Sequence, residues 1–161
     1  MKQKMTVALL VLLCATTNWM PTAQAEGLPV VQDFTVEAKE SMNKQAPILV
    51  LFMSKTCPYC EQVLDEFLLP MQRRPGYDSK VILRQIDIFS SSKLINFNGK
   101  TISQSAFAKA HEVWAVPTVM LFDSQGNELT KIVGLLTVDF YLAYLDNAIN
   151  ESQAKIKAGT R

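Results

Sequence analysis

Two cysteines stand three positions apart in the segment MSKTCPYCEQV, residues 53–63. The spacing of Cys57 and Cys60 is compatible with four kinds of site: a redox-active thiol pair, half of a metal site, a haem attachment point and a structural disulfide. Pro58 and Tyr59 separate the two sulfurs, and an apolar run precedes them. The choice between these sites determines what chemistry the chain can do.

Three of the four sites are poorly supported by the surrounding residues. Haem attachment requires a histidine directly after the second cysteine, and that residue is Glu61. Structural zinc requires four Cys or His ligands, whereas the chain beyond residue 25 offers two cysteines and His111. A disulfide that closes so small a loop restricts the unfolded chain little. A zinc site shared by two chains, or a Cu(I) site on the two sulfurs, stays open as an alternative.

A redox pair explains the local sequence better. An apolar run over residues 47–53 predicts a buried strand, and Pro58 suits the first turn of a helix. Cys57 then lies at a helix N-terminus, where free N–H groups and the helix dipole stabilise a thiolate, and Lys55 adds positive potential. We therefore expect Cys57 to be the nucleophile and Cys60, one turn further on, to resolve the mixed disulfide.

The first 25 residues are typical of a cleaved signal peptide. Lys2 and Lys4 precede an apolar stretch over residues 5–14, and Ala-Gln-Ala at 23–25 provides small residues for a signal peptidase. The apolar stretch is roughly ten residues long, against about 20 needed to span a bilayer. A retained membrane anchor and lipidation of Cys14 are the weaker alternatives. Removal of this segment leaves only the paired cysteines, in a compartment where thiols can be oxidised.

The remaining chain, residues 26–161, is long enough for one globular domain. In the full chain of 161 residues 48% are apolar, so the protein can bury a core without several disulfides. The 16 basic and 15 acidic residues are scattered and give a net charge of +1. This balance does not indicate nucleic-acid binding.

Hydrophobic patterns predict alternating helices and strands along this domain. Apolar residues at helical spacing predict helices over residues 31–45, from residue 57, over 104–113 and from Thr137 to 150, with a frayed polar tail after it. The last helix is expected to bury one apolar face, formed by Phe140, Tyr141, Tyr144, Leu145, Ala148 and Ile149. Apolar runs predict buried strands over 47–53, 81–89 and 119–122, and a returning strand over 129–133. Asn98-Gly99 predicts an additional hairpin within residues 94–103. The order predicts an α/β fold with a central mixed sheet and helices on both faces.

The strand, the Cys57-Pro58-Tyr59-Cys60 helix start and the later segment 115–118, AVPT, together resemble the thioredoxin superfamily. The resemblance implies a thioredoxin fold with the hairpin inserted before a cis-proline. It also implies that Pro117 is this cis-proline and lies beside the cysteines, and that the backbone of Val116 pairs with a substrate peptide.

The branch of the superfamily is less sharply indicated. The CPYC sequence matches the glutaredoxin active site, but residues 134–136 read GLL in roughly the region where glutaredoxins hold glutathione with paired glycines. Thioredoxin proper has a tryptophan before the first cysteine and a buried aspartate six positions before it, where this chain has Thr56 and Leu51. The leader, the hairpin and residues 122–126 most resemble exported, periplasmic thioredoxin-like proteins of the SoxW type.

These features predict a periplasmic thiol–disulfide oxidoreductase that reduces disulfides on exported protein substrates. A membrane redox partner would recycle it; we expect a monomer without cofactor, resident metal or nucleic-acid partner. A disulfide-donating oxidase and a non-catalytic module that binds copper or a client protein through the two thiols are the alternatives.

Other candidate residues receive structural interpretations. Trp114 and Phe97 are expected to pack in the core or the hairpin, although a peptide-docking rim is conceivable for both. A surface or capping position is expected for His111. Glu61 and Asp65 are expected to be solvated charges.

Overall fold

The computed structural model describes residues 27–159, so the predicted signal peptide and Cys14 lie outside the described residues. The main sheet has four strands in the order β2-β1-β5-β6: β1 (Ile48–Met53), β2 (Ile82–Asp87), β5 (Thr118–Phe122) and β6 (Glu128–Val133). Strand β1 is parallel to β2 and antiparallel to β5, and β5 is antiparallel to β6. This mixed sheet confirms the predicted fold class.

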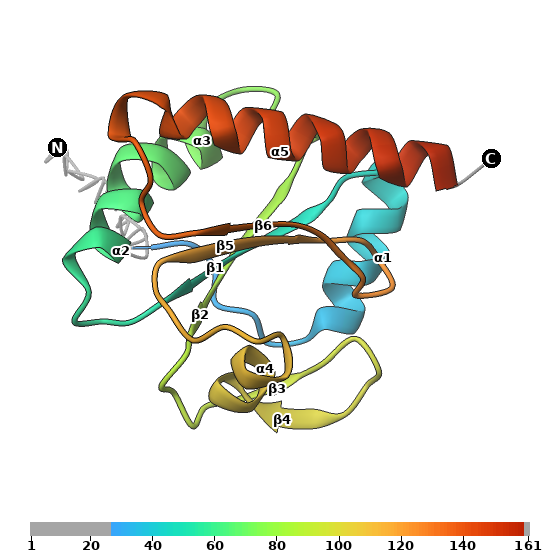
Figure 1. Cartoon of the computed structure of the whole chain (residues 1–161). Coiled ribbons are helices and arrows are strands. Elements are labelled where there is room, and N and C mark those ends of the chain that lie inside the picture. The colour runs from blue at the N-terminus through green and yellow to red at the C-terminus, as the bar shows by residue number, and fades with distance from the viewer. Residues whose placement is uncertain (1–26, 160–161) are drawn as a thin grey trace, which may run out of the picture.

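Helices cover both faces of the sheet (Figure 1). One layer contains α2 (Pro58–Val63), the π-helical turn η1 (Leu64–Leu68), α3 (Leu69–Arg73) and α5 (Val138–Gly159). The other contains α1 (Phe34–Lys44) and α4 (Gln104–Ala110). Side chains of β1 alternate between the layers: Leu49 and Leu51 join the cluster under α5, while Val50 and Phe52 join Phe34 and Phe107.

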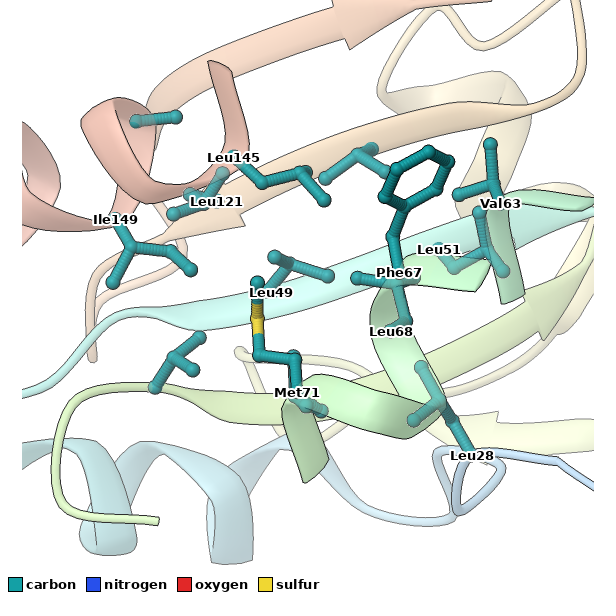
Figure 2. Close-up of a cluster of buried hydrophobic side chains, with 14 of the residues drawn as sticks. Leu28, Leu49, Leu51, Val63, Phe67, Leu68, Met71, Leu121, Leu145 and Ile149 are labelled. Atoms are coloured by element: carbon teal, nitrogen blue, oxygen red, sulfur yellow. The ribbon is translucent and has the colours of Figure 1, made fainter. Parts of the chain in front are cut away.

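Burial on both faces explains why β1 is an uninterrupted apolar run. Every residue from 48 to 52 has a relative exposure of 0%. Figure 2 shows the cluster beneath α5, in which Leu49, Leu51 and Leu121 of the sheet meet Phe67 and Leu145 of the helices. The cysteine motif is thus held between a rigid strand and a packed helical layer.

The predicted hairpin is present and packs on the second layer, the one that contains α1 and α4. Its strands β3 (Lys93–Ile95) and β4 (Thr101–Ser103) pair antiparallel, and Gly99 takes the positive φ of 74° that its turn requires. Phe97 stacks on Phe34 with ring centroids 4.4 Å apart. The expectation that Phe97 packs within the fold is therefore confirmed.

The predicted frayed tail after residue 150 is wrong, because α5 continues to Gly159. Its polar residues dock onto β6: Ser152 is fully buried, with its hydroxyl 3.3 Å from that of Thr130, and Lys155 Nζ donates to the Leu129 carbonyl at 3.0 Å. Polar docking of this kind leaves no apolar periodicity to detect.

Other element boundaries shift by a few residues. The helix predicted over 31–45 begins at Phe34, because Asp33 caps it by accepting from the N–H of Thr35, and Val30 before it bridges to Gln85 of β2. The helix predicted over 104–113 ends at Ala110, where the chain turns through Glu112 at a φ of 53°. No helix within residues 27–159 is long and apolar enough to cross a membrane.

Candidate active site

The cysteine motif lies at the end of the sheet where four chain segments meet. In the strand register, Met53 at the end of β1 faces Asp87 at the end of β2, and Phe52 faces Thr118 at the start of β5. Thr118 in turn faces Val133 at the end of β6. Residues that follow β1, β2 and β6, or precede β5, therefore share this edge.

Cys57 is the N-cap residue of α2. Its backbone is extended, with φ −106° and ψ 104°, and its Sγ accepts a hydrogen bond from the N–H of Cys60 at 3.2 Å. Pro58 occupies the first helical turn, where no N–H is needed. A sulfur that accepts a helix N-terminal N–H is well placed to carry negative charge.

The two sulfurs differ in exposure. Cys57 is half-buried and Cys60 is fully buried, and both are free thiols. Burial raises the pKa of the Cys60 thiol to about 12; Cys57 and Glu61 add to the increase, and a backbone hydrogen bond with Ser54 opposes it. Cys57 is therefore the more accessible of the two sulfurs, and its role as the attacking nucleophile stays a prediction.

The segment predicted to complete the site lies beside Cys57. The Val116–Pro117 peptide bond is cis, and Cys57 Sγ is 3.9 Å from the Val116 carbonyl oxygen. The carbonyl of Pro117 accepts from the N–H of Gly134 at 2.7 Å, which ties the loop to the end of β6. Thus the fold brings together the cysteines and the proline segment that the sequence singled out.

The chain matches the model of the thioredoxin-like domain over residues 34–149. It belongs to the thioredoxin-like domain family. Among solved structures, a thioredoxin-fold protein from Helicobacter pylori has 18% identity and a TM-score of 0.50, covering 71% of this chain and 81% of its own. Thioredoxin h from poplar has 19% identity and a TM-score of 0.50, covering 73% and 95%. Both likenesses concern the fold. No curated protein matches the sequence.

In this thioredoxin-like domain, the residues around the two cysteines are mostly exposed. Pro58 and Lys55 are exposed, and Tyr59 keeps 65% of its surface accessible. Glu61 and Asp65 are exposed as expected. Tyr59 is therefore accessible from solvent within the cysteine motif.

Trp114 does not pack in the core as expected, because 70% of its surface is exposed. It lies three positions before Pro117, in the loop that leads into the cis bond. The weaker of the two interpretations, a position on the rim of the site, fits the structure better.

His111 takes the C-cap position of α4, one of the two placements expected for it. Its ring packs against Phe107 and Phe122, with centroids 4.4 and 5.0 Å apart. Burial, followed by the charge of Lys131, lowers the pKa of this imidazole. His111 thus belongs to the packing of the second layer.

Two features of the site were missed in the sequence. Tyr141 of α5 is fully buried, and its hydroxyl has no hydrogen-bond partner among the described residues. Leu51 is also fully buried and provides no carboxylate where thioredoxin has one. The absence of that carboxylate was the signal in the sequence for another polar group near Cys60.

The second missed feature is a set of exposed apolar residues at the same end of the sheet. They follow β2 and β6 or begin α5: Phe89 (74% exposed), Leu136 (60%) and Phe140 (60%). The sequence placed Phe140 on the buried face of the last helix, which is wrong.

Within residues 27–159, no group of three or more His, Cys, Asp or Glu side chains could hold a metal ion.

Proposed function

We propose that this protein is a thiol–disulfide oxidoreductase that acts on protein substrates. The observation that carries the proposal is the half-exposed Cys57 sulfur at the start of α2, 3.9 Å from the carbonyl of Val116 and one helical turn from the buried Cys60. A helix N-terminus favours the thiolate, which is the reactive form of cysteine.

In the reducing direction, the Cys57 thiolate attacks one sulfur of a substrate disulfide. A bond forms between Cys57 and that sulfur, the substrate S–S bond breaks, and the second substrate sulfur leaves as a thiolate. Cys60 then loses its proton to water and attacks Cys57, forming the Cys57–Cys60 disulfide and releasing the first substrate sulfur. Two electrons pass from the protein to the substrate.

Protein substrates are supported by the surroundings of Cys57. Exposed Tyr59 lies in the motif, exposed Trp114 lies in the loop before Pro117, and exposed Leu136 and Phe140 follow β6. An apolar surface around a reactive sulfur suits an apolar polypeptide segment better than a small charged disulfide. Val116 is proposed to hold the backbone of that segment.

We further propose that the protein works in the periplasm as a member of the SoxW type. The support is in the sequence: the basic and apolar leader over residues 1–25, the CPYC motif and the hairpin before Pro117. Recycling by a membrane redox partner follows from that location, since each reduced substrate leaves the protein oxidised.

The direction of electron flow is proposed to be reducing. A redox titration against glutathione tests it. A midpoint reduction potential of about −270 mV, the value of thioredoxin, supports a reductase. A potential of about −120 mV, the value of a strong oxidant, supports the disulfide-donating alternative.

An insulin-reduction assay tests the activity. We expect turnover by the wild type and none by Cys57→Ser. Cys60→Ser should still attack but not resolve, so that mass spectrometry detects a mixed disulfide at Cys57. Equal turnover by the wild type and Cys57→Ser would overturn the proposal and leave thiol-dependent copper or client binding as the alternative.

A further inference from the structure

The buried thiol of Cys60 poses a chemical problem for the proposed reaction. It must become a thiolate to attack Cys57, yet burial raises its pKa to about 12. A side-chain hydrogen bond with Cys57, the N-cap of α2, raises this pKa further, and negative charge on Cys57 or on Glu61 of α2 acts in the same direction. Ser54, the residue after β1, lowers this pKa through a backbone hydrogen bond, and Leu51 of β1 has no polar atom on its side chain.

Tyr141 of α5 is a buried ionisable side chain that interacts electrostatically with Cys60. Burial, followed by the charge of Cys60, raises the pKa of this phenol to about 12, so it keeps its proton and can donate near neutral pH. Its ring packs on Phe67 of η1 at 5.0 Å between centroids. Phe67 and Cys60 belong to one continuous helical segment, over which the start of α5 lies (Figure 1).

The Tyr141 hydroxyl is buried without a partner. The side chain has 0% relative exposure, and its oxygen makes no hydrogen bond with any residue in 27–159. An unsatisfied buried hydroxyl is unfavourable, and phenylalanine would fill the same space without that cost. A polar atom kept at such a position needs a role that appears in another state of the protein.

We propose that the Tyr141 hydroxyl donates a hydrogen bond to the Cys60 thiolate when this thiolate forms, and so speeds resolution of the mixed disulfide. This inference rests on the proposed function. The proton of Cys60 leaves to water, the thiolate accepts from Tyr141 O–H, and the sulfur then attacks Cys57. Tyr141 keeps its own proton throughout. Its hydroxyl stabilises the negative charge on the Cys60 sulfur and does not contact the substrate.

The test follows the two steps separately with 5,5′-dithiobis(2-nitrobenzoate). The Cys57 thiolate attacks this disulfide and releases one thionitrobenzoate; attack by Cys60 on the resulting mixed disulfide releases the second. Stopped-flow absorbance gives both rates between pH 6 and 9 for the wild type, Tyr141→Phe and Tyr144→Phe. Tyr144 is a matched control, because it lies on the same helix and is 42% exposed.

We expect Tyr141→Phe to slow the second release about tenfold, as for loss of a hydrogen bond to a charged atom. Its pH–rate profile should shift upward by about one unit, while the first release keeps its wild-type rate. Tyr144→Phe should match the wild type in both steps. Thermal unfolding of Tyr141→Phe should occur at or above the wild-type temperature, because a hydroxyl without a partner is removed.

An unchanged second step in Tyr141→Phe, or equal slowing in Tyr144→Phe, would overturn the inference and leave the proposed function standing. Failure of Tyr141→Phe to fold would also overturn it, since the hydroxyl would then have a structural partner. A wild type that releases no thionitrobenzoate would instead contradict the proposed function itself.

Discussion

The two cysteines of the site share one helical turn but have opposite environments. Cys57 caps α2 and is half-exposed, whereas Cys60 is fully buried. In the unfolded chain both thiols are solvated. Ionisation of Cys60 is therefore coupled to folding, because its charged form is tolerated in the unfolded state and disfavoured in the folded one.

This coupling predicts that the reduced protein loses stability in alkali. The folded pKa of Cys60 is raised from 9.0 to about 12, so its stabilising effect is complete below pH 9 and is lost as the pH rises from 9 toward 12. Urea unfolding of reduced protein between pH 8 and 10.5 should show a free energy of unfolding that declines more steeply for the wild type than for Cys60→Ala. The difference in slope should approach about 1.4 kcal/mol per pH unit. Parallel slopes would contradict the burial of this thiol.

At the scale of elements, the β3–β4 hairpin is fixed to the second layer by close contact with the β5–β6 turn. Gly126 in that turn has a φ of 83°, and a Cβ atom placed there would lie 2.6 Å from the Phe97 ring. Phe97 also packs on Phe34 and Phe122. The hairpin therefore depends on the absence of a side chain at Gly126 as much as on its own turn.

Gly126→Ala should destabilise the protein by roughly 2–4 kcal/mol, because the substitution combines a left-handed backbone with displacement of a packed aromatic ring. Gly99→Ala is the matched control: its φ is 74°, but nothing lies within 4 Å of the added Cβ. It should cost only about 1–2 kcal/mol. Chemical denaturation of both variants measures the difference, and equal losses would show that the hairpin does not rest on this contact.

The strands and the cysteine motif could be predicted from the sequence because their signals are local. A buried apolar run, two cysteines and an X-Pro segment are recognisable without knowledge of the fold. The helical tail of α5 was missed because Ser152 and Lys155 dock through hydrogen bonds, which leave no apolar pattern. Trp114 and Phe140 were placed in the core because hydrophobicity alone does not distinguish a core residue from an exposed one.

In the whole molecule, the topology collects at one end of the sheet residues that are distant in the chain. Cys57 meets Val116 there, and Gly134 binds the carbonyl of Pro117. Exposed Trp114 and Phe140 lie at the same end. An exposed apolar surface beside a reactive sulfur has a cost in water, and binding of a polypeptide would offset it.

This arrangement predicts that Trp114→Ala and Phe140→Ala weaken reduction of a protein disulfide but not of a small one. Each variant should lower kcat/KM for insulin about tenfold, since a large aromatic contact is lost, while the rate with 5,5′-dithiobis(2-nitrobenzoate) stays at the wild-type value. Met42→Ala is the control, because Met42 is 58% exposed on α1, outside the end of the sheet that carries Cys57. Equal losses with both disulfides would indicate damage to the cysteines, and no loss with insulin would mean that the protein substrate docks elsewhere.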